Sequence, residues 1–212
     1  MSPEEITRNR EAFESCCHQY IQRNGIDALL EYLKTKTDFF EAPSSTSFHL
    51  NEPGGLCRHS LNVFETLLTL YTSLVEPRIE DGTSPFADTV STESIAVVAL
   101  FHDVCKANTY RPTERWKKDA NGRWMSYPGY EVNDSFPFGH GEKSCVVIHW
   151  FLPLRQEELL AIRWHMGMFE MPDAASSTRR SYRAAMEHSP LVSLLQAADL
   201  VASNCLERTT KY

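Results

Sequence analysis

Apolar residues recur at the spacing of an α-helix along most of this chain. In the stretch 57–75, Leu61, Phe64 and Leu68 lie three or four residues apart and therefore share one helical face. The same periodicity, interrupted by glycine and proline, predicts helices over 4–22, 26–34, 57–75, 92–105, 140–152, 155–166, 177–188 and 190–207, with loops over 35–55 and 76–90. The pattern predicts an all-α fold.

The segment 107–139 departs from this pattern. It is rich in aromatic residues that alternate with Gly, Pro and Asn, most densely in an aromatic insert over 116–138. Asn121-Gly122 within it is a turn signal typical of a β-hairpin. We therefore expect a helical bundle with one short inserted β-hairpin. An N-terminal helical extension over 1–47 would precede the main domain, 48–212, and form one compact unit with it.

Composition narrows the possible functions. The chain has 212 residues, 42% of them hydrophobic, which is enough to bury one sizeable core. A formal net charge of -7 argues against binding to duplex nucleic acid, because that affinity comes largely from basic residues that neutralise phosphates. A bound metal pair would still make a site locally positive, so small anionic substrates remain compatible with the acidic total.

The spacing of the cysteines and the length of the apolar runs indicate the cellular compartment in which the protein is expected. The six cysteines form no CxxC pair, which argues against a zinc ribbon or a redox motif. No apolar run approaches the roughly 18 residues needed to span a bilayer. Residues 1–15 are polar and charged, unlike a signal peptide. We expect a cytoplasmic protein with reduced cysteines and no membrane association.

Candidate chemistry begins at His102-Asp103, which follows the apolar run 97–101. An ionisable pair beside a buried helix needs a partner, because desolvating a charge is costly. A metal ion would satisfy both side chains, and a helix end that reaches solvent would do so equally. His59 and Asp199 are further metal-ligand types within apolar helical stretches, although each alone is compatible with a hydrogen-bonded core residue. Together these residues offer a nitrogen and oxygen donor set for a divalent ion.

A family resemblance becomes visible in the flanking residues. The chain reads Gly-Gly-Leu-Cys-Arg-His-Ser-Leu over 54–61 and His-Asp-Val-Cys-Lys over 102–106, with Asp199 near its end. This order resembles the H…HD…D pattern of the HD phosphohydrolase superfamily over residues 48–205. The first segment is also similar to the HD domain of YhaM-type bacterial exoribonucleases. The resemblance implies an HD-domain-like helical bundle with the metal ligands His59, His102, Asp103 and Asp199.

Two further histidines match positions that bind a second metal in some HD subfamilies. His140 opens a predicted helix, and His165 lies near the end of the next one. The resemblance implies that both ligate a second ion and that Asp103 bridges the two. The alternatives are a histidine in an N-terminal turn and a histidine favoured at a helix C-terminus by the helix dipole. We expect one or two divalent ions, with Mn, Fe, Co, Ni, Zn and Mg all compatible.

Basic residues beside these ligands are candidates for substrate contacts. Lys106 follows Asp103 by three residues, which predicts a shared helical face. Its amine would either stabilise a phosphoryl oxygen, as HDxxK relatives imply, or form a local ion pair with Asp103. Arg58 and Arg163 are candidate phosphate clamps, and His49 is expected to approach the site from its loop.

The resemblance implies hydrolysis of a phosphoester by metal-activated water, with Asp103 and Lys106 as catalytic residues. A nucleotide or another small phosphorylated compound is the expected substrate. Two alternatives stay open. One is a 3′–5′ exonuclease or phosphodiesterase acting on short single-stranded nucleic acid, with the aromatic insert stacking on bases or packing as a lid. The other is a metal-stabilised ligand-binding module with little turnover.

Overall fold

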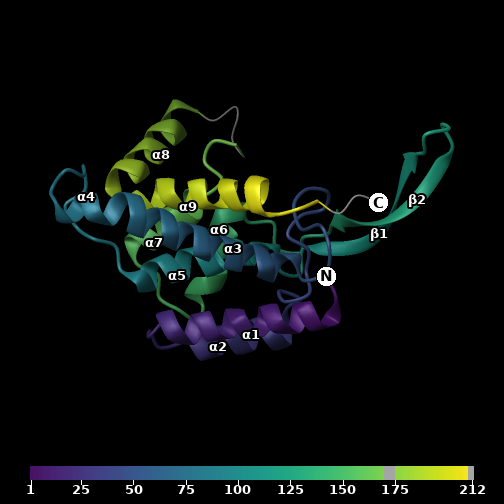
Figure 1. The fold of residues 1–212 in the computed structure, drawn as a ribbon, viewed down its shortest axis with the longest axis horizontal. Helices are drawn as coiled ribbons and strands as arrows, with labels where there is room; N and C mark the ends of the chain where they lie inside the picture. The colour runs from purple at the N-terminus through teal and green to yellow at the C-terminus, as the bar shows by residue number, and fades with distance from the viewer. Residues whose placement is uncertain (170–174, 210–212) are drawn as a thin grey trace.

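Helices build most of the molecule, and an antiparallel hairpin extends from them (Figure 1). The computed structural model describes residues 1–169 and 175–209. The helices are α1 (Pro3–Tyr20), α2 (Ile26–Lys36), α3 (Gly55–Leu70), α4 (Glu76–Glu80), α5 (Thr92–Phe101), α6 (His140–His149), α7 (Gln156–Trp164), α8 (Ser176–His188) and α9 (Pro190–Val201). The strands are β1 (Tyr110–Lys118) and β2 (Trp124–Val132). The predicted helical fold with one short hairpin is confirmed.

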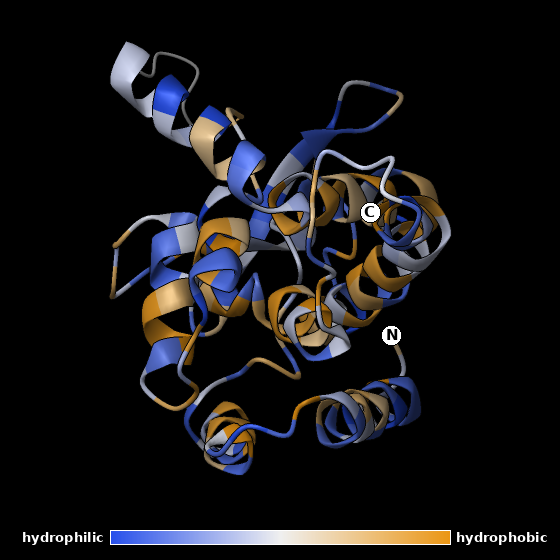
Figure 2. Ribbon diagram, turned by 90° about the vertical axis from the view of Figure 1, so that its left-hand side faces the viewer, coloured by the Kyte–Doolittle hydropathy of each residue, from blue (hydrophilic) through white to orange (hydrophobic). Residues whose placement is uncertain are grey.

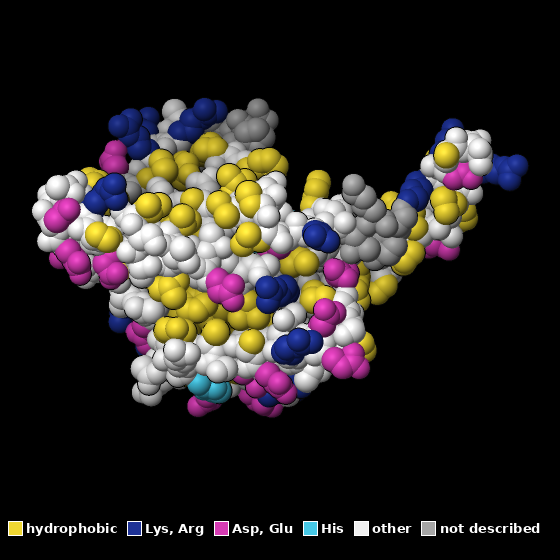
Figure 3. Space-filling view, in the orientation of Figure 1, with side chains coloured by type: hydrophobic (Ala, Val, Ile, Leu, Met, Phe, Trp, Pro, Cys, Tyr) yellow, Lys and Arg dark blue, Asp and Glu magenta, His cyan; other side chains and the backbone are white. Residues whose placement is uncertain are grey.

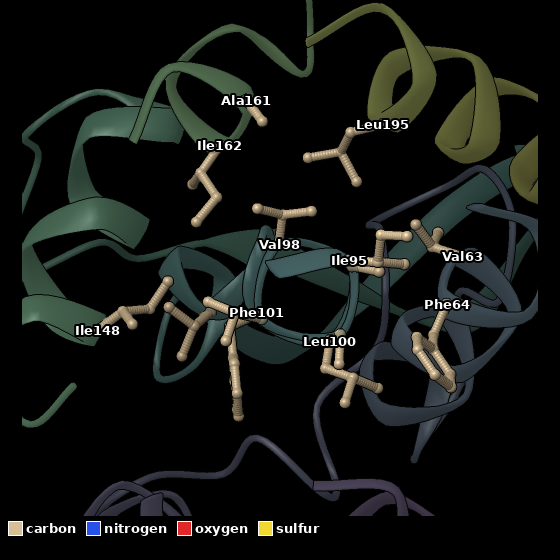
Figure 4. Close-up of a cluster of buried hydrophobic side chains, with 14 of the residues drawn as sticks. Val63, Phe64, Ile95, Val98, Leu100, Phe101, Ile148, Ala161, Ile162 and Leu195 are labelled. Atoms are coloured by element: carbon tan, nitrogen blue, oxygen red, sulfur yellow. The ribbon is translucent and has the colours of Figure 1, made fainter. Parts of the chain in front are cut away.

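Helix α5 is the centre of the hydrophobic core. Every side chain from Ile95 to Phe101 is 0% exposed, so the helix is apolar on all sides and must be surrounded. Helices α1, α3, α7 and α9 pack around it. Figure 4 shows Val98 between Ile162 of α7 and Leu195 of α9, while Phe64 of α3 lies on the side of Leu100. The residues that directly follow α5 in the sequence are therefore held at the middle of the bundle.

The two N-terminal helices share this core. Phe13 of α1 packs edge-on against Phe101 of α5 with ring centroids 5.6 Å apart. Arg23, in the turn between α1 and α2, connects these helices to the rest of the chain. It donates to the buried carboxylate of Glu158 in α7 at 2.7 Å and to the carbonyl of Pro153 at 2.9 Å. These contacts join the segment before residue 48 to the bundle.

The hairpin is an arm that projects from the bundle (Figure 1). Its strands pair in register from Tyr110↔Val132 to Lys118↔Trp124. At its tip the carboxylate of Asp119 accepts hydrogen bonds from the backbone N–H groups of Asn121 and Arg123. The turn signal in the sequence lies in this loop. Helix α8 lies at the edge of the bundle, where it packs against α7 and α9, and it is largely hydrophilic (Figure 2).

Several predicted boundaries were wrong. The helix predicted over 57–75 ends at Leu70 and continues as a π turn, η1 (Tyr71–Val75). The expected loop over 76–90 contains α4, where Pro77 occupies the first helical turn, a position that tolerates a missing N–H. The helix predicted over 92–105 ends at Phe101, and a 3₁₀ turn, η2 (Val104–Lys106), follows. The helix predicted over 190–207 ends at Val201 and continues as a π turn, η3 (Ala202–Leu206). Periodicity does not detect these π and 3₁₀ turns, because they continue the helical direction with a different number of residues per turn.

None of the described helices combines the length and apolar character that crossing a membrane requires. All six cysteines are free thiols.

The Arg23–Glu158 pair gives a test of how firmly the N-terminal helices are attached. Replacing Arg23 with Ala is expected to lower the free energy of unfolding by about 3–5 kcal/mol, because it leaves the 0%-exposed Glu158 side chain without its cationic partner. Urea denaturation followed by circular dichroism measures this. The control is Arg183→Ala, which breaks an exposed pair with Glu187 and should change the stability by less than about 1 kcal/mol. Equal losses in the two variants would show that the N-terminal helices are not held through this pair.

Candidate metal centre

Six side chains from five parts of the fold meet beside the end of α5. His59 comes from α3 and Asp199 from α9, while His102 and Asp103 follow α5 directly. The remaining two are His140, the first residue of α6, and His165, which follows α7. The side chains of His59, His102, Asp103 and His165 are at most 1% exposed, whereas those of His140 and Asp199 are 21% and 17% exposed. The cluster is therefore buried and opens toward solvent on the side of His140 and Asp199.

The carboxylate of Asp103 lies at the middle of the cluster and divides it into two halves. Its Oδ2 atom lies 3.5 Å from Nε2 of His59 and 3.5 Å from Nε2 of His102. Its Oδ1 atom lies 2.6 Å from Nε2 of His140 and 3.6 Å from Nε2 of His165. Each carboxylate oxygen thus faces its own pair of imidazoles. Asp199 belongs to the first half, with Oδ1 3.3 Å from Nε2 of His59.

Three of the histidines are held from behind through their Nδ1 atoms. His102 donates to the carbonyl of Ala99 at 2.9 Å, and His165 donates to the carbonyl of Ile162 at 2.7 Å. His59 is hydrogen-bonded through Nδ1 to both oxygens of Glu207, at 3.0 and 3.1 Å. Since these acceptors place the proton on Nδ1, the Nε2 lone pairs of the neutral rings point into the cluster. Histidines that ligate metals in proteins are commonly oriented in this way.

This orientation brings nitrogen lone pairs close to one another, and a cation between them would remove their repulsion. The Nε2 atoms of His59 and His102 lie 3.3 Å apart, and in their neutral forms both carry a lone pair toward the other. The Nε2 atom of His165 is buried and has no hydrogen-bond partner among the described residues. A proton on His59 or a metal ion among the Nε2 atoms removes the repulsion. The buried His and Asp groups lie close enough together to hold a metal ion, and the donor set fits a divalent ion of the first transition row.

The protonation of the rings follows from their partners. Burial lowers the pKa of His102 to about 3, so this ring is neutral near pH 7. Burial also acts against the charged form of His59, but hydrogen bonds to Asp199 and Glu207 outweigh it and raise its pKa to about 10. Burial opposes ionisation of Asp103 as well, yet Lys106 and the surrounding imidazoles hold the pKa of its carboxyl well below the usual range. The cluster therefore favours a positive charge at the position between His59 and its acidic neighbours.

Two glycines permit the close backbone approaches that form the cluster. A Cβ on Gly55, at the start of α3, would lie 2.1 Å from the carbonyl oxygen of Leu50. A Cβ on Gly141, next to His140, would lie 2.6 Å from the carbonyl oxygens of both Ile162 and Arg163. A larger residue at either place would separate the segments that carry the histidines. Steric limits on the backbone thus explain why glycine occurs in the turn before His59.

Lys106, Arg163 and Arg58, the basic residues expected to contact substrate, differ in the contacts that they make in the structure. Lys106 places Nζ 2.6 Å from Oδ2 of Asp103, through a 3₁₀ turn rather than the expected α-helical face. This is the local ion pair, one of its two expected roles. Arg163 forms an ion pair with Glu142 at 2.7 Å and stacks over the ring of Trp164. Arg58 is half-buried, and within residues 1–169 and 175–209 it forms no hydrogen bond or ion pair with the cluster.

Sequence reasoning missed one residue of the site, Glu207. Its side chain is 0% exposed and receives hydrogen bonds from His59 and from Asn62, one helical turn later in α3. His49 approaches as expected, since its ring lies 4.9 Å from that of His59 and its Nε2 lies 3.9 Å from Glu207. No sequence signal identified Glu207, because a glutamate after the end of an apolar helix is ordinarily a surface residue.

Comparison of the chain with protein-family models, with curated proteins and with solved structures finds no match.

Proposed function

We propose that the chain is a metal-dependent phosphohydrolase of the HD type, which hydrolyses a phosphoester of a nucleotide or another small phosphorylated substrate. One observation carries the proposal: the buried Nε2 atoms of His59, His102 and His165 converge around Asp103, while each ring is held through Nδ1 by a hydrogen bond from behind. The order of these residues along the chain supports assignment to the HD superfamily.

The two halves of the cluster support a two-metal site. His59, His102, Asp103 and Asp199 would hold one divalent ion, and Asp103, His140 and His165 would hold the second. The support is the division of the Asp103 carboxylate, because each of its oxygens faces a different imidazole pair. When bound, such ions lower the pKa of water toward neutrality and neutralise charge on phosphoryl oxygens.

The remaining residues of the site bind and orient the substrate in this proposal. The side chain of Lys106 is 13% exposed and reaches the cluster at its partly open side. Its ammonium group can pair with a phosphoryl oxygen that enters from there, in place of its present contact with Asp103. The fully buried His59 and His102 leave no room for approach from the other side. A phosphoester would therefore enter past Lys106, His140 and Asp199.

Metal stoichiometry tests the two-metal arrangement. We expect the wild-type protein, incubated with Mn²⁺ and dialysed, to hold two ions per chain by elemental analysis. His140→Ala should hold one, because it removes a ligand of only one half. Asp103→Asn should hold neither tightly, because it weakens the carboxylate shared by both halves.

The control is His188→Ala, which changes an exposed histidine at the end of α8. It should retain two ions. One ion per chain in both the wild type and His140→Ala would contradict the two-metal site, and a wild-type protein without bound metal would contradict the proposed function.

Turnover is the second test. In the presence of Mn²⁺ we expect phosphate release from at least one member of a panel of nucleoside mono- and triphosphates, cyclic dinucleotides and generic phosphoesters. His102→Ala should reduce kcat/KM by more than the roughly 10–100-fold that loss of an outer hydrogen bond to a ligand causes. Release that is equal in the two proteins would point to a contaminating enzyme. Absence of release from the whole panel would favour a metal-stabilised binding module.

The arm favours a second candidate, a 3′–5′ exonuclease or phosphodiesterase acting on single-stranded oligonucleotides. Trp116 and Trp124 are 58% and 65% exposed, and the strand register places them on one face with Lys118. Residues 110–132 contain five Lys or Arg and three Asp or Glu, in a chain of net charge -7. Figure 3 shows hydrophobic and basic side chains along the arm. Aromatic rings beside cationic groups are typical of surfaces that bind single strands.

The arm is also continuous with the cluster. Strand β1 begins four residues after Lys106, and β2 leads to His140 within eight residues. A single strand bound along the arm would therefore have one end near the proposed metal site.

A double substitution separates the two candidate substrates. Trp116→Ala with Trp124→Ala should weaken oligonucleotide binding at least about fivefold, since a stacked base contributes about 1–3 kcal/mol. Hydrolysis of a mononucleotide should be unchanged, because both residues lie on the arm and outside the cluster. Fluorescence anisotropy with a labelled oligonucleotide measures the first effect. The control is Trp150→Ala, an equally exposed tryptophan after α6. Unchanged oligonucleotide affinity in the double variant would exclude the arm as its binding surface.

A further inference from the structure

Glu207 is a buried carboxylate that contacts the cluster from outside. Its side chain is 0% exposed, and both of its oxygens lie within hydrogen-bond distance of Nδ1 of His59, at 3.0 and 3.1 Å. The amide of Asn62 donates to Oε1 at 2.9 Å. A buried carboxylate without such donors would be strongly unfavourable. The arrangement therefore indicates an ionised group held in one orientation against the back of His59.

The partner of His59 differs in kind from those of the other two rings. His102 and His165 donate from Nδ1 to neutral peptide carbonyls within their own helical turns. His59 donates to a carboxylate that lies 148 residues later in the chain. A charged acceptor binds the Nδ1 proton more strongly than a carbonyl does. It therefore fixes the tautomer of His59 and increases the electron density on Nε2, the atom that faces Asp103 and Asp199.

The backbone around Glu207 places its carboxylate with little freedom. The N–H of Glu207 donates to the carbonyl of Ala202 at 3.1 Å and closes the π turn η3. The next residue, Arg208, accepts a hydrogen bond from the N–H of Leu50 at 2.9 Å. The segment after α9 is thus fastened both to its own helix and to the loop that carries His49.

We propose that Glu207 is a positioning residue that orients His59 and strengthens it as a metal ligand, so that the segment after α9 controls metal affinity in the first half of the cluster. This inference rests on the proposed function, because it takes His59 as a ligand. It adds a determinant of metal affinity that lies outside the HD pattern of residues. Glu207 contacts Nδ1 of His59, so in this arrangement it would not be a ligand of an ion held at Nε2.

Glu207→Gln is the decisive substitution. Glutamine keeps the size of the side chain and an oxygen acceptor for the Nδ1 proton, but it removes the negative charge. We expect the dissociation constant for Co²⁺, measured by competition with a chelator, to rise about 10–100-fold. The visible absorption band of the bound Co²⁺, which reports ligand geometry, should shift.

The matched control is Asp27→Asn. It neutralises a carboxylate that lies 3.0 Å from Nε2 of His18 on the surface, and it should leave Co²⁺ affinity unchanged. Wild-type affinity in Glu207→Gln overturns this inference and leaves the proposed function standing. A wild-type protein that binds no metal overturns the proposed function, and this inference with it.

A second measurement needs no substitution and covers the case in which Glu207→Gln fails to fold. Long-range ¹H–¹⁵N spectra of the wild-type protein loaded with Zn²⁺ report which nitrogen of His59 carries the proton. We expect the proton on Nδ1 and the metal-induced shift on Nε2. The reverse assignment would mean that Glu207 does not orient this ring, and the inference would fall.

Discussion

The burial of one charged carboxylate determines how the rest of this site is built. The Asp103 side chain is 1% exposed, and an ionised carboxylate at that depth is stable only when cations or hydrogen-bond donors surround it. In the metal-free protein the ammonium of Lys106, the Nε2–H of His140 and the protonated His59 fill this role, and a metal ion among the Nε2 atoms of the four histidines would fill it when bound. These groups come from separate elements, so the requirement of a single side chain brings together α3, α6, α7 and the end of α5.

The fold meets this requirement by ending helices at unusual places. Adjacent residues of an α-helix point about 100° apart, so a continuous helix would direct His102 and Asp103 to different sides. The helix ends at Phe101, and the non-helical backbone of Asp103 turns its carboxylate into the cluster. The π turn after α9 acts similarly for Glu207, which reaches the rear of His59. In both cases a small irregularity follows a well-packed helix, so the rigid core positions the polar groups.

The same geometry explains why the site separates into a buried and an accessible side. His59 and His102 are enclosed by the core around α5, whereas His140, Asp199 and Lys106 border the partly open side. The arm begins and ends beside this open side, because β1 follows Lys106 and β2 precedes His140. Under the proposed function, metal binding would therefore depend mainly on the packed half of the molecule, and substrate choice would depend on the arm and the open rim.

The sequence alone determined the helical class, the inserted hairpin and the candidate residues of the cluster. Periodicity reports which positions are buried, and a histidine or aspartate within an apolar helix reports that a partner must exist. The identity of that partner was decided by tertiary structure. Glu207 was not detected, since nothing in the local pattern shows that the chain turns back over α3. The contact of Arg163 with Glu142, and the division of the Asp103 oxygens between two imidazole pairs, likewise depend on how α6 packs on α7. Local sequence encodes the need to bury or pair a group, whereas the pairing itself depends on elements that are distant in the chain and meet only after folding.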